Sequence, residues 1–472
     1  MLDPRRPAWY AFPTMSDRRP NLIYVFPDQF RQQSLGCMNA DPVVTPNLDR
    51  LAAEGRVLTD VVSTCPLCSP YRAMLFTGKY PHANGVPHNC NSENKQYGIE
   101  LRADERCLTD VLHDAGYHQA YIGKWHLDAP TEADEKWGEG RRGDDKVWDT
   151  FTRPERRHHV DFWHSYGCCD NHLRPHYWEG DRIEDRIDVD EWSVKHEADV
   201  ALDYIRNEGG RFRDADKPFA LFLAHNPPHT PFEQVPERLL AAYEGKTSDD
   251  LLNRPNVALE GYAHSAAKQV KNYFAAVTGI DEQIGRILDL LDQQGLADDT
   301  IVIFTADHGE MMGSHALMHK NVWYEESYLV PFIIRWPGKV PVGRDDLLVS
   351  TPDLMPTLLG LCGAAGAAPE DVHGRDLSPA LLGEEIERPA SGLYMFMKAD
   401  DPAGGNRGVR THRYTFAVCR KDDGTEETFL HDNQEDPYQL QNVAAERPEV
   451  VAELTAEMNR GLERTGDPWL KK

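Results

Sequence analysis

The sequence predicts an α/β fold in which helices sandwich a mixed, mostly parallel sheet, followed by a smaller α+β unit. Two observations predict this class. Short buried apolar runs alternate with helical segments through most of the 472 residues. After the Gly- and Ala-rich segment 360–371, which is predicted to be a linker, closely spaced strand-like runs precede one helix rich in Glu and Leu.

The buried strands are predicted from continuous apolar runs. NLIYVF at 21–26 is typical, because it shows no polar alternation and is ended by Pro27 and Asp28. Such a run indicates a strand that is buried on both faces. The other predicted strands of this sheet cover 118–122, 219–224, 300–305 and 331–336.

Two helices are predicted most clearly. Thr45-Pro46 is expected to open the first, with Leu48 and Leu51 on its apolar side and Gly55 as its C-terminal cap. The second covers 280–295, where four aliphatic side chains share one face: Ile284, Ile287, Leu288 and Leu291.

We expect three parts along the chain: an N-terminal arm at 1–18, in which Met15 is an alternative start to Met1, a large domain at 19–365, and a C-terminal subdomain at 366–472. Within the large domain, residues 130–190 show no sustained period, so we expect a long excursion that shapes a binding site. The subdomain is expected to contain a small antiparallel sheet and a helix, with strands at 391–398, 408–418 and 425–432 and the helix near 447–463.

The composition argues against two classes of partner. The formal net charge of −26 disfavours nucleic acid and anionic membrane surfaces. No apolar run is long enough for a transmembrane helix, and the N-terminal residues lack the apolar core of a secretory signal. The nine cysteines have no regular spacing, which is typical of reduced thiols. We therefore expect a cytoplasmic protein with no membrane partner.

Polar side chains follow the predicted strands where each one ends. In an open α/β sheet the ligand site lies outside the carboxyl ends of the strands. We therefore expect five strand ends to bring these groups to one rim, although each residue alone could equally be a turn, a cap or a surface residue. The groups are Asp28 and Gln29, Lys124 and His126, His225 and His229, Asp307 and His308, and Lys320 in the polar loop beyond.

Four of these groups suit a divalent cation. Together they offer mainly oxygen ligands and one imidazole, which is typical of sites for hard or borderline cations. We expect Ca²⁺, with Mn²⁺ or Mg²⁺ as alternatives, and not zinc, because no thiolate is included. The predicted ligands are Asp28, Gln29, Asp307 and His308.

The CPLC stretch at 65–68 leaves several interpretations open. The spacing fits a redox pair, since a cysteine at a helix N-terminus has a lowered pKa. A four-thiolate metal site would need a second C-x-x-C pair, which the chain lacks. The redox interpretation leaves Pro70, Arg72 and the polar rim unexplained, and Cys65 is more simply a small buried residue.

The stretch CSPYRAMLFTG at 68–78 resembles the signature C-x-P-x-R-x-x-x-x-T-G of the type I sulfatases, a formylglycine-dependent family of the alkaline-phosphatase-like superfamily. The resemblance implies an alkaline-phosphatase-like fold and the hydrolysis of sulfate monoesters. It covers most of the chain in the same order: PNLIYVFPDQ, GKWHL, PPHTPF, TADHGEMMGSH, YEES, DLMPTLLGLCG and LHDNQEDPYQLQNVA.

The resemblance implies that a maturase oxidises Cys68, and not Cys65, to the aldehyde formylglycine. A helix N-terminus favours anions at this position. One hydroxyl of the aldehyde hydrate, activated by the metal, would attack sulfur and displace the alcohol. The other hydroxyl would then lose its proton and expel sulfate, a step that serine or cysteine could not complete.

The resemblance also implies a role for each matching side chain. Arg72 would steady the hydrate, and Lys124 and Lys320 would bind sulfate oxygens. His229 would protonate the leaving alcohol, and His126 would assist breakdown of the sulfated intermediate. The metal would be held by Asp28, Gln29, Asp307, His308 and the oxygen derived from Cys68. Two further candidates, equally well structural, are His225 and His315.

Two departures from the family pattern keep an alternative open. Many sulfatases have Asp-Asp and Asp-Asn where this chain has Asp28-Gln29 and Asp307-His308. The present variant resembles phosphonate monoester hydrolases and some choline- and arylsulfatase-like members, and it would shift metal preference toward manganese. Tyr71 replaces the commoner serine and leaves C-x-P-x-R intact.

Three functions are therefore compared. A phosphonate or phosphate ester hydrolase is the nearest alternative, and the GKWH stretch favours a sulfatase over it. A non-catalytic glycan-binding relative would be expected to lose Cys68, Lys320 or a metal ligand, and none is missing.

We expect the substrate to be a sulfated mono- or oligosaccharide, with a small aryl or alkyl sulfate as the alternative. FWHSYGCCDNHLRPHYW at 162–178 offers aromatic planes and imidazoles that could bind a sugar ring, or that could pack under a long loop. The candidate substrate-binding residues there are His172, His176 and Trp178.

Overall fold

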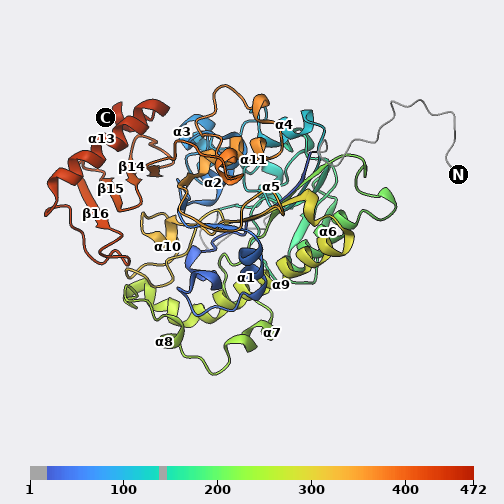
Figure 1. The fold of residues 1–472 in the computed structure, drawn as a ribbon, viewed down its shortest axis with the longest axis horizontal. Helices are drawn as coiled ribbons and strands as arrows, with labels where there is room; N and C mark the ends of the chain where they lie inside the picture. The colour runs from blue at the N-terminus through green and yellow to red at the C-terminus, as the bar shows by residue number, and fades with distance from the viewer. Residues whose placement is uncertain (1–18, 138–145, 472) are drawn as a thin grey trace.

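The computed structural model describes residues 19–137 and 146–471, so the predicted arm at 1–18 lies outside the described residues. A ten-stranded mixed sheet forms the centre of the described chain (Figure 1), and its strand order comes from the backbone pairing as β11-β2-β10-β9-β1-β8-β4-β5-β6-β7. Its strands are β1 (Asn21–Val25), β2 (Arg56–Leu58), β4 (His118–Lys124), β5 (Phe162–Tyr166), β6 (His176–Trp178), β7 (Arg186–Asp188), β8 (Phe219–Ala224), β9 (Thr300–Phe304), β10 (Ile333–Arg335) and β11 (Gly343–Asp345).

The middle of this sheet is parallel. Strand β1 pairs with β8 on one side and β9 on the other, so that Leu22 faces Ala220 and Ile301 in register. Strand β4 continues the parallel run next to β8, and β5 lies beside β4. Every residue of β8 and β9 is buried, which explains their uninterrupted apolar sequences. The predicted strand at 331–336 is β10, which runs antiparallel to both of its neighbours.

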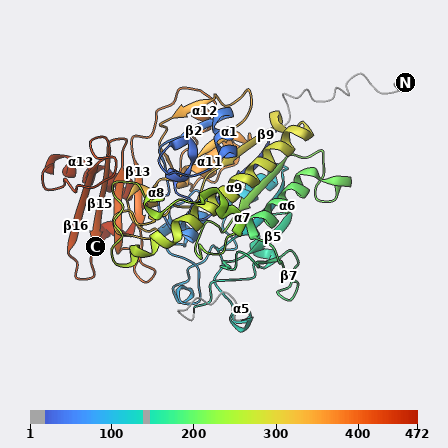
Figure 2. The ribbon, with the colours of Figure 1, turned by 90° about the horizontal axis from the view of Figure 1, so that it is seen from below.

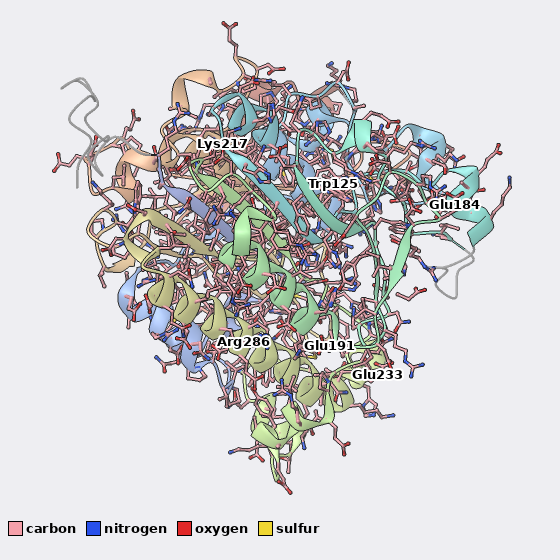
Figure 3. All side chains as sticks on the ribbon, turned by 90° about the vertical axis from the view of Figure 1, so that its right-hand side faces the viewer. Trp125, Glu184, Glu191, Lys217, Glu233 and Arg286 are labelled. Carbon is pink, nitrogen blue, oxygen red and sulfur yellow. The ribbon has the colours of Figure 1, made fainter. Side chains whose placement is uncertain are left out.

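Helices cover both faces of the sheet. In Figure 1, α1 (Pro46–Glu54), α6 (Ser193–Arg206) and α9 (Ala266–Gln294) lie on one side, and α2 (Cys68–Thr77), α4 (Leu108–Asp114) and α11 (Leu354–Leu361) lie on the other. Figure 3 shows α6 and α9 side by side, and Arg286 of α9 forms an ion pair with Asp199 of α6 at 2.6 Å. The shorter helices are α3 (Pro81–Asn84), α5 (Glu132–Trp137), α7 (Glu237–Leu240), α8 (Ser248–Leu251), α10 (Glu325–Tyr328) and α12 (Ser378–Leu381).

Helix α1 ends at Glu54 with Gly55 as its C-terminal cap and with Leu48 and Leu51 buried, as predicted. Helix α9 is longer than predicted, because it begins at Ala266 and not near 280. Its first half buries aromatic and small side chains such as Tyr273, Phe274 and Ala275, so the aliphatic face of 280–295 is only the second half of one continuous helix.

Part of the segment 130–190 belongs to the central sheet. Strand β5 pairs in parallel with β4, and β6 and β7 extend the sheet from it in antiparallel order. The sequence predicts a long excursion off the core here, because the segment shows no sustained period. Strands β5 and β6 mix aromatic and polar residues without a clear period, and β7 is largely exposed, so they lack the apolar runs that identify the central strands.

The C-terminal residues form a separate small sheet at one end of the molecule (Figure 2). Its antiparallel strands are β13 (Gly392–Phe396), β14 (Gly405–Arg410), β15 (Tyr414–Arg420) and β16 (Glu426–Asp432), and α13 (Pro448–Thr465) packs against β14. The single strand predicted at 408–418 is wrong. The Thr411 hydroxyl accepts the backbone N–H groups of Arg413 and Tyr414, and this turn separates β14 from β15.

This C-terminal unit packs directly behind α2. Its apolar cluster contains Met395 and Phe416 of the small sheet, together with Cys65 and Leu67, which precede α2, and Met74 of α2 itself. Strands β3 (Val61–Val62) and β12 (Val349–Ser350) lie far apart in the chain and form a separate, parallel two-stranded sheet. Within the described ranges 19–137 and 146–471, no helix has the length and apolar character needed to cross a membrane.

Candidate active site

Four parallel neighbours, β1, β4, β8 and β9, deliver the predicted polar groups to one edge of the sheet. Asp28 follows β1, Lys124 ends β4, His225 follows β8 and Asp307 follows β9. These groups come from four strand ends and not five, because Lys320 lies, as predicted, in the polar loop beyond β9, which continues to α10.

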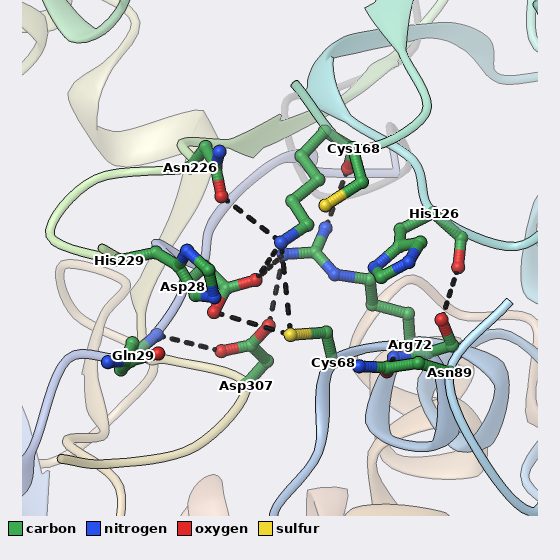
Figure 4. Close-up of polar contacts among 12 residues, drawn as sticks. Asp28, Gln29, Cys68, Arg72, Asn89, His126, Cys168, Asn226, His229 and Asp307 are labelled. Carbon is green, nitrogen blue, oxygen red and sulfur yellow. Dashed lines mark hydrogen bonds and ion pairs between the residues drawn. The ribbon is translucent and has the colours of Figure 1, made fainter. Parts of the chain in front are cut away.

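Cys68 is the first residue of α2 and is 1% exposed. Its Sγ lies 3.5 Å from Asp28 Oδ1 (Figure 4). The same sulfur lies 3.4 Å from Lys320 Nζ, 3.4 Å from His308 Nε2 and 3.8 Å from Lys124 Nζ. If Cys68 is converted to formylglycine, this sulfur marks the place of the aldehyde-derived oxygen. The side chain is therefore the point on which the predicted groups converge.

The charges around Cys68 favour an anion at this atom. Burial would raise the pKa of the thiol, and Asp28 would raise it further. Lys124, Lys320 and His308 outweigh both effects, and the pKa lies well below its ordinary value.

The sequence of α2 explains how Cys68 is held. Pro70 lies in the first turn, where no N–H is needed. The Ser69 hydroxyl donates to the carbonyl of His126 at 2.7 Å, and the Ser69 N–H donates to Asn89 Oδ1 at 3.0 Å. Gly78 ends the helix at φ 65°, where its N–H donates to Met74 O. The T-G end of the signature is thus a helix cap.

Asp28 and Asp307 are fully buried and fixed by several donors. Asp307 Oδ1 accepts the backbone N–H groups of Gln29 at 3.0 Å and His308 at 2.9 Å. Burial and the neighbouring Asp28 raise the pKa of Asp307 to about 6. Two buried carboxylates whose oxygens lie within 4.8 Å of each other resist ionisation together, which is typical of sites that hold a cation.

The donor set fits a divalent cation. Ligand atoms of Asp28, Cys68, Asp307 and His308 all lie within 4.8 Å of one another. His308 Nδ1 is 3.0 Å from the carbonyl oxygen of Gly309, so Nδ1 carries the hydrogen and Nε2 is left to face the carboxylates. Gln29 adds a neutral amide oxygen, although this oxygen accepts a hydrogen bond from Lys320 Nζ at 2.8 Å.

Lys124 and Arg72 are buried cations that contact the carboxylates. Lys124 Nζ lies 2.6 Å from Asp28 Oδ2, and burial, which lowers its pKa, is outweighed by Asp28, which raises it above the ordinary value. Arg72 Nη2 lies 3.1 Å from Asp307 Oδ2 and 3.4 Å from Asp28 Oδ2. The guanidinium therefore contacts the two carboxylates and joins α2 to the ends of β1 and β9.

His229 and His126 lie on different sides of Cys68 (Figure 4). Burial, followed by Lys320, lowers the pKa of His229 to about 3, and its Nδ1 is 2.7 Å from the carbonyl oxygen of Thr230. Burial also lowers the pKa of His126, but the thiols of Cys168 and Cys68 outweigh it and raise the pKa above its ordinary value. His126 Nε2 is 3.0 Å from the carbonyl oxygen of Cys90.

Gln29 and His126 both have positive φ, at 67° and 55°. Non-glycine residues with this conformation also cluster in the loop that carries Lys320: Met312, His315, Ala316, His319 and Asn321. Such strained positions concentrate at functional sites, where the surrounding structure enforces them. The polar residues at this edge are held in place by backbone geometry as well as by hydrogen bonds.

The candidate substrate-binding residues contact protein groups, and their roles stay predictions. His225 is fully buried, with Nδ1 against Glu197, and His172 Nε2 is 2.9 Å from the carbonyl oxygen of His229. The remaining three are His176, paired with Asp149; Trp178, whose N–H donates to Ile183 O; and His315, stacked on Tyr324.

Sequence reasoning missed three residues at this site. Asn226 accepts a hydrogen bond from Lys124 Nζ at 3.1 Å through Oδ1, and Cys168 lies beside His126 and Lys124. Glu310 accepts from the amide of Gln29. Asn226 lies within HNPPH and Glu310 within TADHGE, so their motifs were noticed, but neither residue type alone signals a site. Cys168 had no signal, because β5 was not predicted.

Cys65 lies away from these polar groups. It is fully buried in the apolar cluster behind α2, and burial raises the pKa of its thiol to about 12. The prediction of a small buried residue is confirmed. None of the nine cysteines, all of which lie in the described part, forms a disulfide.

The fold and this site define a sulfatase. The family model described as Sulfatase matches residues 20–364, and the model described as N-sulphoglucosamine sulphohydrolase, C-terminal, matches residues 313–466. The chain belongs to the sulfatase family. The predicted membership of the type I sulfatases is confirmed, and the protein is a hydrolase of sulfate esters.

Known relatives agree over nearly the full length. The chain is 43% identical to an Endo-4-O-sulfatase of Bacteroides thetaiotaomicron over 480 residues, which cover 95% of this chain and 93% of the relative. A solved structure described under the metabolism of multiple glycosaminoglycans by the same organism has a TM-score of 0.88 at 41% identity, covering 96% of this chain and 98% of that chain.

The fold class is also confirmed by a more distant structure. The phosphonate monoester hydrolase of Agrobacterium radiobacter has a TM-score of 0.67 at 22% identity, covering 96% of this chain and 97% of that chain. At this identity the likeness concerns the fold alone. The predicted alkaline-phosphatase-like sheet with a C-terminal antiparallel subdomain is therefore confirmed.

Proposed function

We propose that this sulfatase removes a 4-O-sulfate from a sugar within a glycosaminoglycan-type oligosaccharide, using formylglycine made from Cys68. The observation that carries the chemistry is the convergence of two lysines, Lys124 and Lys320, with the carboxylate of Asp28 and the imidazole of His308 on Cys68 at a helix N-terminus. The substrate class is supported by the relative at 43% identity, an Endo-4-O-sulfatase that aligns along nearly the whole chain.

In this proposal Lys124 and Lys320 bind sulfate oxygens. Both ammonium groups lie within 4 Å of Cys68 Sγ and are largely buried, so their charges act in a poorly screened environment. Arg72 keeps Asp28 and Asp307 in place through Nη2. The sulfate would therefore lie between the two lysines, with its sulfur facing the nucleophile.

Two histidines move protons. His229 donates a proton to the oxygen of the leaving sugar, and the sulfate ester's own negative charge favours protonation of this imidazole when substrate binds. His126, on the other side of Cys68, accepts a proton from the remaining hydroxyl of the formylglycine hydrate when sulfate is expelled.

Asp28, Asp307, His308 and Gln29 would hold a divalent cation, Ca²⁺ in the first instance, beside the residue derived from Cys68. When bound, the cation supplies positive charge that favours the ionised form of the nucleophilic hydroxyl.

A cytoplasmic location is part of the proposal, and recovery of the activity in the periplasmic fraction would contradict it.

The test is a comparison of substrates with protein co-expressed with a formylglycine-generating maturase. We expect sulfate release from chondroitin 4-sulfate oligosaccharides, and little or none from 6-sulfated oligosaccharides of equal length. Faster turnover of a phenyl phosphonate ester than of any sulfate ester would instead support the alternative phosphonate hydrolase. Hydrolysis of 4-nitrophenyl sulfate alone would contradict the sugar assignment.

A further inference from the structure

Tyr262 is the most exposed of the large apolar side chains in the described part of the chain, at 71% of its surface. It lies in the short 3₁₀ turn Gly261–Ser265 that precedes α9. The ring is nevertheless fixed, because its hydroxyl is 3.1 Å from His319 Nε2. The two rings are 5.7 Å apart between centroids. An exposed aromatic ring whose orientation is fixed by its neighbours presents a rigid face on which an apolar group can stack.

His319 also contacts a second aromatic ring. Phe232 stacks on the imidazole, with centroids 6.4 Å apart and an interplanar angle of 14°. The backbone N–H of His319 donates to Glu310 Oε1 at 2.8 Å, and the residue has a φ of 68°. Ring contacts and a strained backbone thus fix the imidazole, and the imidazole fixes Tyr262.

These rings are carried by the two loops that also carry reacting groups. His319 precedes Lys320, whose Nζ is 3.4 Å from Cys68 Sγ, and Phe232 lies three residues beyond His229. The segment before Tyr262 runs along the Lys320 loop, since Ala258 N–H donates to the carbonyl of Gly313 at 2.9 Å and Val257 forms a bridge with Ser314. Tyr262 therefore packs next to the two loops that carry Lys320 and His229.

We propose that Tyr262, oriented by His319, is a stacking site for a pyranose ring next to the sulfated sugar in the same oligosaccharide. This inference rests on the proposed function. Cys68 is 1% exposed whereas Tyr262 is 71% exposed, so a sugar whose sulfate reaches Cys68 lies deeper than Tyr262. A neighbouring sugar, linked outward, is the group that can place its apolar C–H face on the ring. A rigid tyrosine loses little conformational entropy on such binding.

Four proteins test the inference: the wild type, Tyr262→Ala, Tyr262→Phe and the control Val342→Ala. Val342 is also exposed, at 63%, and lies beside β11 at the opposite edge of the sheet from β7. The readout is the ratio of kcat/KM on a chondroitin 4-sulfate hexasaccharide to kcat/KM on 4-nitrophenyl sulfate, which has no neighbouring sugar.

Tyr262→Ala should lower this ratio by about three- to tenfold through a higher KM for the hexasaccharide, which is the range expected for loss of one aromatic contact. Tyr262→Phe should keep most of the ratio, because it keeps the ring, and Val342→Ala should keep all of it. An unchanged ratio in Tyr262→Ala, or an equal fall in Tyr262→Phe, would overturn the inference.

A binding experiment separates this inference from the proposed function. Isothermal titration of the same hexasaccharide into the wild type and Tyr262→Ala, each carrying Cys68→Ala, measures affinity without turnover. Weaker binding to the Tyr262→Ala protein supports the stacking site even if no sugar sulfate is hydrolysed by the active enzyme. Equal affinity would contradict the stacking site even if 4-O-sulfate hydrolysis is confirmed.

Discussion

Cys65 and Cys68 are separated by only two residues, yet their side chains lie in opposite environments. Cys65 is packed against the C-terminal subdomain, in the cluster that contains Met395 and Phe416. Cys68 points to the polar edge of the sheet and contacts Lys124 and Lys320. Within the C-x-x-C stretch, Cys65 therefore serves packing and Cys68 is the reactive residue. Through Cys65, the C-terminal subdomain stabilises the turn that presents Cys68.

The first prediction concerns these two cysteines. Cys68→Ala should abolish sulfate release, because Lys124, Lys320 and His308 all converge on the Cys68 thiol, whereas Cys65→Ala should keep a kcat close to the wild type. Mass spectrometry of the peptide spanning 65–72, from protein co-expressed with the maturase, should place the aldehyde at 68.

Cys65→Ala should act on stability instead. Removing a buried sulfur leaves a small cavity between α2 and the small sheet, with a cost of about 1 kcal/mol in the free energy of unfolding. Denaturation in urea measures this cost. Two unmodified thiols after exposure to an active maturase, or a large loss of kcat in Cys65→Ala, would contradict the assignment.

The second prediction assigns Asn226 a positioning role. Its Oδ1 accepts from Lys124 Nζ at 3.1 Å, and its Nδ2 donates to the carbonyl of Cys169 at 2.7 Å, which fixes the amide. Asn226→Ala should lower kcat by about 10- to 100-fold, the range for residues that orient a reactive group. A double-mutant cycle with Lys124→Ala measures the coupling: once Lys124 is absent, Asn226→Ala should cause little further loss. Additive losses would show that Asn226 acts independently.

The sequence predicted the parallel centre of the fold because those strands are buried on both faces, as β8 and β9 show. It placed Asp28, Lys124, His225 and Asp307 at one edge because parallel strands share a direction. It failed for β5 and β6, whose aromatic and polar residues carry no clear period. Asn226 and Cys168 could not be recognised, since their importance depends on which strands are neighbours and not on residue type.

The third prediction is a pH dependence of stability. Asp281 of α9 is buried and accepts the backbone N–H of Leu48 at 2.7 Å and the amide of Asn47 at 2.9 Å. Burial raises the pKa of this carboxyl from its ordinary value of 3.8 to about 6. Because the folded-state pKa is the higher one, its contribution to stability is fully present below pH 3.8 and is lost as the pH rises through 6.

Asp281→Asn removes this titration. The free energy of unfolding of the wild type, relative to the variant, should therefore fall by about 2 kcal/mol between pH 4 and pH 7. Urea denaturation of both proteins at several pH values checks this, with Asp289→Asn, an exposed residue of the same helix, as control. A constant difference across the range would show that Asp281 does not titrate there.

The fourth prediction concerns the metal. Treatment with a chelator should abolish activity and lower the Tm, and added Ca²⁺ should restore both. At roughly 100 times its Kd, Ca²⁺ should raise the free energy of unfolding by about 3 kcal/mol. Asp307→Asn should remove the calcium-dependent Tm shift. Asp110→Asn is the control, because Asp110 belongs to a separate buried group with Cys107 and His158. Loss of the shift in the control, or its persistence in Asp307→Asn, would place the ion elsewhere. Mn²⁺ and Mg²⁺ in the same assay identify the preferred cation.

The fifth prediction separates proton donation from sulfate binding. His229 lies beside Lys320 and Asp28, close to Cys68, and is assigned the proton of the leaving alcohol. His229→Ala should lower kcat/KM on a sugar 4-sulfate by about 10²- to 10⁴-fold, because a sugar alkoxide leaves poorly without a proton. The effect on 4-nitrophenyl sulfate should be much smaller, because nitrophenolate leaves as an anion. Lys320→Ala is the comparison, since loss of a sulfate-binding cation should lower both rates similarly. If His229→Ala also lowers both rates equally, this histidine binds sulfate and does not donate the proton.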